Sequence, residues 1–384
     1  MIGGALPLIR SDLAMDDAQA GWIIGTAFAV PYGVTALSLA VLLRGRQASI
    51  GWLVGGVVVW TAASIATGAA HSVASLSLAR AGLGIGQAMF VPMAIAWIVG
   101  ATGSGGQARA LSLFTSGSTI GRSAALLTVG GLLSLLALFA GTGAHWRWLF
   151  VVTALPNLML LPLLMKMRPV VSPSATGSAA IAIDWRTLIQ FFAVAITPVL
   201  LIQASSGWLP TLFVRDRGLT AGQAATILGA VTLFAAPAGQ ILGGWLMTRF
   251  TSWHASIPAI VLASLTATLV PLMAIVWAPG LIGATIGVAA MTLMLGVSSF
   301  CGLFGVQILI PKTAHVSVNG IYLALVTLVA VGAGPLLTGA LAMASGSGTA
   351  ALADALMTTG LIATGLCAIA VVAVRGRYRR RCAA

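Results

Sequence analysis

Charged side chains are scarce in this chain. Only 7% of its 384 residues are charged, and the six acidic residues are all aspartates, because the sequence contains no glutamate. A soluble domain of this size needs far more charge to cover its surface. Enzymes built on a carboxylate pair, an HExxH metal motif or a G-x-S-x-G nucleophile motif are also excluded, because none of these patterns occurs.

Cysteine is equally rare. The three cysteines, Cys301, Cys367 and Cys382, lie far apart and have neither the spacing of a metal site nor that of a disulfide framework. Cys301 and Cys367 fall within apolar segments, where packing is the simplest role. We therefore expect no metal and no cofactor.

Apolar segments of membrane-spanning length recur along the whole chain. Apolar residues make up 59% of the sequence, and the mean hydropathy is +1.06. A helix needs about 20 mainly apolar residues to cross a bilayer, and the 46 glycines suit helices that pack closely within one. These segments predict eleven full spans, at 19–43, 50–70, 75–99, 110–141, 146–165, 187–214, 223–247, 257–277, 280–310, 318–344 and 352–374. A short apolar piece, Met1–Ile9, precedes them, and we expect it to be the end of a first helix whose beginning is absent from this chain.

The basic residues predict the orientation in the membrane. Alternate loops on one side carry thirteen of them: Arg44, Arg46, Arg109, Lys166, Arg168, Arg186, Arg249, Lys312, Arg375, Arg377, Arg379, Arg380 and Arg381. The other side carries four: Arg10, Arg147, Arg215 and Arg217. Because cytoplasmic loops are rich in Lys and Arg, we expect the C-terminus in the cytoplasm. The net charge of +13 is thus explained without nucleic acid, which we do not expect as a partner.

The longest interior polar segment divides the chain into two parts. It is rich in Pro, Ser and Gly and follows the span at 146–165, which is the sixth when Met1–Ile9 is counted as the first. We predict an all-α membrane protein of two six-helix bundles related by a pseudo-two-fold axis, with the first helix truncated. The expected parts are an N-terminal bundle (1–167), a cytoplasmic linker (168–185), a C-terminal bundle (186–375) and a basic cytoplasmic tail (376–384). Such a repeat is typical of alternating-access transporters.

Five short patterns, in order along the chain, resemble one family of transporters. They are Ala5-Leu6-Pro7-Leu8-Ile9 with Asp12-Leu13 and Gly21-Trp22; Arg80-Ala-Gly-Leu-Gly84-Ile-Gly86; His145-Trp146-Arg147-Trp148-Leu149-Phe150; Gly207-Trp208-Leu209-Pro210; and Gly218-Leu219-Thr220. Together they resemble the major facilitator superfamily over the whole chain, with the organic-solute and anion carriers and the spinster-like carriers nearest. The resemblance implies that spans 1, 4, 7 and 10 line a central cavity, counting Met1–Ile9 as span 1.

The chain departs from the family at its gates. The inner loop after span 2 normally reads G-x-x-x-D-R-x-G-R-R; here Gly45 and Arg46 fit its end, but Leu42 replaces the aspartate. Arg249 ends the equivalent loop of the second half. We take Gly45, Arg46 and Arg249 as candidate gating residues. In span 5, Arg122 stands where antiporters of the family have a proline after Gly121.

The six aspartates all fall in predicted loops, so no carboxylate is expected inside the membrane to carry a coupling proton. A facilitator, an anion exchanger and a symporter that uses the charge of its substrate all remain possible. So does a coupling acid that lay in the absent part of the first helix.

Two arginines within spans are the main candidates for substrate binding. A charge near the bilayer centre costs at least about 3 kcal/mol on insertion scales and persists when it faces the bundle interior. Arg122 lies close to mid-span and Arg80 in the outer third of span 4. A guanidinium without an acidic partner suits a carboxylate or a phosphate. The alternative, which we favour for Arg80, is that the side chain binds backbone carbonyls.

Uncharged polar residues within spans complete the set of candidates. Polar side chains in spans face protein or water, although about half of them only bridge helices. These candidates are Gln87, Tyr32, Gln203, Gln307 and Asn319.

We therefore expect a monomeric plasma-membrane carrier, in the inner membrane if the cell is Gram-negative, that moves a small organic and anionic solute by alternating access. The alternatives are a drug or lipid exporter of the same superfamily, or a truncated carrier without function. A channel is not expected, because the sequence has neither a filter-like loop nor repeated rings of polar residues.

Overall fold

The computed structural model describes residues 2–42, 49–101, 107–139, 145–167, 183–278, 280–310, 315–346 and 350–383. Within these residues the chain is helical and contains no strand. Ten helical stretches are long and apolar enough to cross a membrane, and α6 adds a shorter apolar stretch, Ile120–Leu136. The described part of the chain therefore confirms the all-helical membrane fold.

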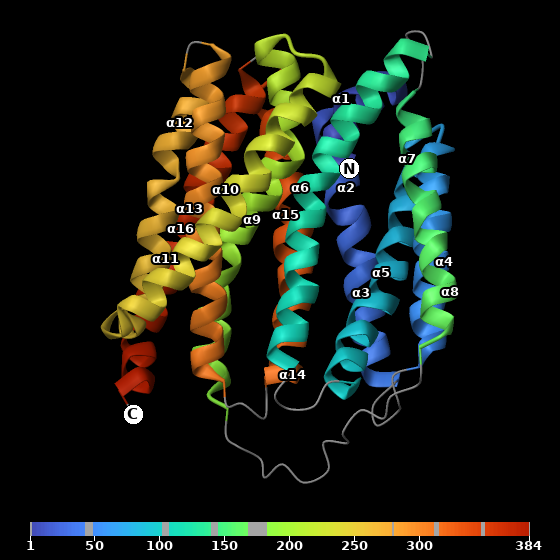
Figure 1. Ribbon diagram of the computed structural model, residues 1–384. Coiled ribbons are helices and arrows are strands. Elements are labelled where there is room, and N and C mark those ends of the chain that lie inside the picture. The colour runs from blue at the N-terminus through green and yellow to red at the C-terminus, as the bar shows by residue number, and fades with distance from the viewer. Residues whose placement is uncertain are drawn as a thin grey trace.

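The first half of the chain, residues 2–167, supplies spans 1 to 6 (blue to green in Figure 1). Its elements are α1 (Ile2–Leu13), α2 (Asp17–Ile24), α3 (Thr26–Leu42), α4 (Ile50–Gly68), α5 (Val73–Ala101), α6 (Gln107–Phe139), α7 (Trp146–Ala154), the 3₁₀ turn η1 (Leu155–Met159) and α8 (Leu160–Met165). Span 2 is α2 with α3, and span 6 is α7 with η1 and α8. Span 1 is represented by α1, whose 12 residues cover about 18 Å at 1.5 Å per residue.

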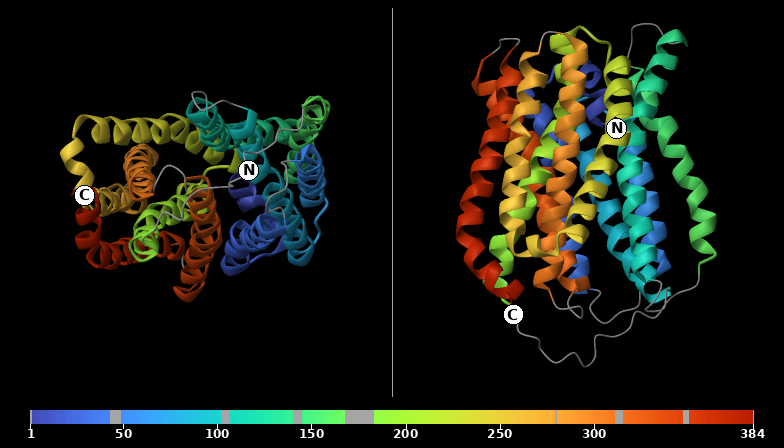
Figure 2. Two further views of the ribbon diagram at one scale, coloured as in Figure 1. Left: turned by 90° about the horizontal axis from the view of Figure 1, so that it is seen from below. Right: turned by 60° about the vertical axis from the view of Figure 1, so that its left-hand side comes forward.

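The second half, residues 183–383, supplies spans 7 to 12 (lime to red). Its elements are α9 (Trp185–Arg217), α10 (Ala221–Arg249), η2 (Thr251–Ser256), α11 (Ile257–Ala267), α12 (Leu269–Trp277), α13 (Leu281–Leu309), α14 (His315–Leu325), the π-helical η4 (Val326–Val331), α15 (Gly332–Ala344) and α16 (Ala351–Ala383). Span 9 is η2 with α11 and α12, and span 11 is α14 with η4 and α15. Viewed along the helices, the two halves form two groups side by side (Figure 2, left).

Two predicted boundaries need correction. The last helix was expected to end at residue 374, before the basic tail, but α16 continues to Ala383 and stacks Tyr378 on Phe191, with ring centroids 4.8 Å apart. The linker was expected to run to residue 185, but Asp184 caps α9 and accepts a hydrogen bond from the Thr187 backbone, so the helix starts at Trp185. Residues 168–182 lie outside the described residues.

Span 2 is broken at Gly25, and the break packs against an irregularity in span 11. A Cβ atom at Gly25 would lie 2.6 Å from the carbonyl oxygens of both Val331 and Gly332, where the π-helical turn ends. Thr26 Oγ1 donates to the Gly332 carbonyl across the same contact, at 2.9 Å. Only a residue without a side chain allows two backbones to meet this closely. The two halves are therefore joined here by backbone contact.

We call the end of the molecule that carries the C-terminus the inner face and the opposite end the outer face (Figure 1). The halves pack tightly toward the outer face. There a Cβ atom at Gly339 of α15 would meet the Asp17 carbonyl oxygen at 2.2 Å. Toward the inner face, nothing among the described residues lies within 4 Å of a Cβ atom built at Gly117 or Gly121 of α6. Among the described residues, the halves are thus in close contact at the outer face, whereas none packs against Gly117 and Gly121 in the inner part of α6.

Candidate functional site: a cavity between the two halves

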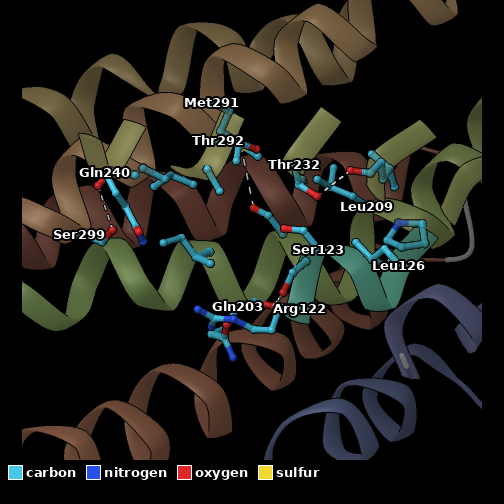
Figure 3. Close-up of a pocket in the computed structure, with 18 residues that line it drawn as sticks. Arg122, Ser123, Leu126, Gln203, Leu209, Thr232, Gln240, Met291, Thr292 and Ser299 are labelled. Atoms are coloured by element: carbon cyan, nitrogen blue, oxygen red, sulfur yellow. Dashed lines mark hydrogen bonds between the residues drawn. The ribbon is translucent and has the colours of Figure 1, made fainter. Parts of the chain in front are cut away.

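A cavity with an empty volume of about 880 Å³, which includes the space open to solvent at its mouth, lies between α6 of the first half and α9, α10 and α13 of the second. Its walls are mainly apolar and carry a few polar groups (Figure 3). The apolar residues are Leu126, Ile202, Leu209, Pro210, Leu228, Ala236, Met291 and Leu295. A mostly apolar pocket with a few convergent polar groups is the usual form of a small-molecule site.

Arg122 supplies the charge of this cavity. It is the sixteenth of the 33 residues of α6, about 22 Å from the start of the helix at 1.5 Å per residue. Its side chain is exposed and lies beside Gln203 of α9 (Figure 3). All six aspartates of the chain are described, and none forms an ion pair with Arg122. A cation near the middle of a span thus faces a cavity without a protein carboxylate to neutralise it.

Polar residues that the sequence analysis missed line the same cavity. They are Ser123, Ser205, Ser206, Thr232, Gln240, Thr292 and Ser299. Some of their hydroxyls are used within their own helices: Thr232 Oγ1 donates to the Leu228 carbonyl at 2.7 Å, and Ser299 Oγ to the Gly296 carbonyl at 3.1 Å. Gln240 and Ser299 lie together at a distance from Arg122 (Figure 3). The presence of Gln240 within span 8 was the one sequence signal that could have found this second polar end.

Arg80 does not line this cavity. Its Nε and Nη2 donate to the carbonyl oxygens of Ile23 and Ile24 at 3.1 and 3.2 Å, and its guanidinium lies 5.1 Å from the centroid of the Phe28 ring. These carbonyls end α2, where the break at Gly25 interrupts the helical hydrogen bonds. Arg80 therefore satisfies the free backbone of the broken span, which is the alternative considered for it from the sequence.

The remaining candidates are also absent from the cavity lining. Gln307 and Asn319 bond to each other, Nε2 to Oδ1 at 2.8 Å and Nδ2 to Oε1 at 3.3 Å, and so bridge α13 and α14. Tyr32 packs its ring on Phe28 at 5.8 Å, and Gln87 is half-buried in α5. The cavity thus brings together Arg122 and Gln203 but not the other five candidates.

Of the candidate gating residues, Gly45 and Arg46 lie outside the described residues. Arg249 ends α10 at the inner face, where it is exposed and its guanidinium lies 5.7 Å from the Phe250 ring centroid. The described residues that line the cavity belong to spans 5, 7, 8 and 10, whereas the family resemblance had implied spans 1, 4, 7 and 10.

The aspartates require a further correction. The sequence analysis placed all six in loops, yet four lie within helices: Asp12 in α1, Asp17 in α2, Asp216 in α9 and Asp354 in α16. Asp17, the first residue of α2, is only 8% exposed. The helix starts early because Asp16 and Gln19 form a capping box, with the Gln19 backbone donating to Asp16 Oδ1 at 2.7 Å.

The family is decided by the sequence match over most of the chain. The model of the Major Facilitator Superfamily matches residues 1–335. This chain belongs to the Major Facilitator Superfamily. It is therefore a membrane transporter. The 3-(3-hydroxy-phenyl)propionate transporter of Escherichia coli (strain K12) is 27% identical to it over 391 residues, covering 97% of this chain and 89% of that protein.

Other members are similar over less of the chain or in fold alone. An MFS-type efflux pump of Mycolicibacterium smegmatis is 25% identical over 273 residues, 68% of this chain and 61% of the pump. A bacterial homolog of the human lysosomal transporter Spinster, solved in an inward-facing and unoccupied conformation, has the same fold with a TM-score of 0.79. It is 19% identical and covers 99% of this chain and 93% of its own. The nucleoside transporter NupG, solved as a point mutant, follows with a TM-score of 0.68, 12% identity, and coverage of 98% and 95%.

Proposed function

We propose that this protein transports a small organic anion by alternating access and that Arg122 binds the anionic group. The observation that carries the proposal is an arginine near mid-span that faces the cavity and has no carboxylate partner among the described residues. Keeping a charge at this depth is costly, and a substrate carboxylate or phosphate supplies the missing counter-charge. The planar guanidinium can bind either group through two parallel hydrogen bonds.

The rest of the cavity supports a substrate with an apolar body. Leucine, isoleucine and methionine side chains form most of the wall, and Gln203 adds a hydrogen-bonding group beside Arg122 (Figure 3). An organic acid with an apolar or aromatic body fits this distribution better than a compact, fully polar anion. The similarity to a carrier of 3-(3-hydroxy-phenyl)propionate agrees with this substrate class.

We place the inner face in the cytoplasm. The described basic residues at this end are Lys166, Arg186, Arg249, Arg375, Arg377, Arg379, Arg380 and Arg381, against Arg10, Arg147, Arg215 and Arg217 at the other. The excess follows the rule that cytoplasmic loops are rich in basic residues. The C-terminus is then cytoplasmic, and the conformation described above faces inward.

The test compares two ligands that share one carbon skeleton, one with a charged carboxylate and one without. Binding and liposome uptake of 3-(3-hydroxyphenyl)propionate and of its neutral amide are measured on the native protein and on Arg122→Gln. We expect the native protein to prefer the acid and Arg122→Gln to lose that preference, with at least a tenfold loss of acid binding, since a charged hydrogen bond contributes about 1.5–3 kcal/mol. Arg122→Lys should recover part of the binding, because it keeps the charge but not the planar fork.

The matched control is Arg186→Gln, which removes one positive charge from the exposed start of α9, away from the cavity. It should bind and transport the acid as the native protein does. Equal binding of acid and amide by the native protein, or unchanged acid transport by Arg122→Gln, would overturn the anion assignment.

A further inference from the structure

At the outer face, a buried carboxylate joins three helices from both halves of the protein. Asp17 of α2 accepts hydrogen bonds from Arg215 of α9 at both oxygens, Nη1 to Oδ2 at 3.0 Å and Nη2 to Oδ1 at 2.6 Å. Arg10 of α1 approaches the same Oδ1 through Nη2, at 2.7 Å. The side chains of Asp17, Arg10 and Arg215 are 11%, 19% and 27% exposed, so the cluster is largely withdrawn from water.

The two arginines belong to different halves. Arg10 and Asp17 are in the first half, whereas Arg215 ends the first helix of the second half. The backbone around Asp17 is in close contact with the second half as well, because a Cβ atom at Gly339 would lie 2.2 Å from the Asp17 carbonyl oxygen. Separation of the halves at the outer face therefore requires the Asp17–Arg215 ion pair to break.

We propose that the Asp17–Arg215 pair is the latch that holds the outer face closed, and that Asp17 and Arg215 thereby set the balance between the two conformations of the transport cycle. This inference rests on the alternating access proposed above. A bidentate, partly buried pair is stronger than an exposed one, because water competes for it less. Breaking it also has a specific consequence: without the carboxylate, Arg10 and Arg215 face each other as like charges and repel.

The chain supplies a matched control within one half. Asp12 of α1 pairs with Arg147 of α7 at 2.7 Å, and also accepts from Trp146 Nε1 at 3.2 Å. This ion pair has the same chemistry, lies at the same outer face and joins helices of the first half only. Its loss should affect the local packing of α7 without favouring separation of the halves.

The experiment measures opening of the outer face directly and without substrate. Cys301, Cys367 and Cys382 are first replaced by serine, and spin labels are attached at Ala69→Cys and Ala350→Cys, which are exposed outer positions of the first and second halves. The distance distribution is then recorded in lipid nanodiscs for the parent, for Asp17→Asn and for Asp12→Asn. Folding is checked by gel filtration and by circular dichroism.

We expect Asp17→Asn to raise the ratio of outer-open to outer-closed molecules about 5- to 150-fold, the usual range of conformational coupling. Arg215→Gln should shift the ratio in the same direction but less, because no pair of like charges is left behind, and it also serves if Asp17→Asn does not fold. Asp12→Asn should match the parent. The latch is overturned if Asp17→Asn and Arg215→Gln keep the distances of the parent, or if Asp12→Asn shifts them equally. Because no substrate is present, failure of the anion assignment at Arg122 would leave this result intact.

Discussion

Replacing Gly130 with alanine adds one methyl group where α6 of the first half contacts α10 of the second. This substitution should shift the protein away from the outer-closed conformation. In the structure, a Cβ atom at Gly130 of α6 would lie 2.2 Å from Oγ1 and 2.7 Å from the backbone nitrogen of Thr226, and 2.9 Å from the Gly222 carbonyl oxygen of α10. The Thr226 hydroxyl can rotate away, but the backbone atoms of α10 cannot move without moving the helix. The contact is therefore incompatible with alanine unless α6 and α10 separate.

The size of the effect follows from the cost of overpacking. Forcing an extra carbon into a well-packed contact costs about 1–3 kcal/mol. If the outer-open conformation relieves the clash, that cost appears as a shift of about 5- to 150-fold in the ratio of the two conformations. The next residue provides the control, because nothing among the described residues lies within 4 Å of a Cβ atom built at Gly131.

The assay is the spin-label distance between Ala69→Cys and Ala350→Cys at the outer face, recorded for Gly130→Ala and Gly131→Ala. Both substitutions gain the same helix propensity, up to about 1 kcal/mol for alanine over glycine. The difference between them therefore isolates the steric term. We expect longer distances between the outer labels for Gly130→Ala and the distances of the parent for Gly131→Ala. Identical distance distributions for the two variants would show that the contact between α6 and α10 at Gly130 does not determine whether the outer face is closed.

Two further predictions concern stability. Arg80→Gln should lower the melting temperature in detergent, because it leaves the buried Ile23 and Ile24 carbonyls without donors at a cost of about 1–3 kcal/mol; an unchanged melting temperature would contradict the structural role. For Asp184, hydrogen bonds from the Thr187 hydroxyl and backbone lower the pKa of the carboxyl below its ordinary value. The ionised Asp184 carboxylate therefore stabilises the folded protein fully above about pH 4, the pKa of an aspartate in the unfolded chain. This stabilisation is lost as the pH falls through the lower pKa that Asp184 has in the folded protein. Asp184→Asn should remove that part of the acid dependence of the melting temperature, and an acid profile identical to the native one would refute this.

Much of the fold could be predicted from the sequence, because a bilayer imposes a simple rule on the chain. Every span needs a long apolar run with its backbone bonded internally, so the runs themselves indicate the helices. The basic residues then predict which ends lie together. The sequence predicted the roles of the polar candidates less well, because a polar residue within a span indicates only that its side chain avoids lipid.

Only the tertiary structure decided what each polar residue contacts. Arg80 and Arg122 look alike in sequence, each an arginine inside an apolar run, yet Arg80 bonds to the backbone of a broken helix and Arg122 faces a cavity. The break at Gly25 that creates Arg80's partners has no strong local signal, because glycine is common throughout the spans.

Asp17 illustrates the same limit. In sequence it is one of several aspartates in a short polar stretch, and a loop position was the natural prediction. Its burial depends on Arg215, which lies 198 residues away, and on the approach of α15. The sequence determined that this chain crosses the membrane repeatedly and which end is basic. Which charges meet across the two halves depends on how the helices pack, because partners so distant in the chain are brought together only by the folded bundle.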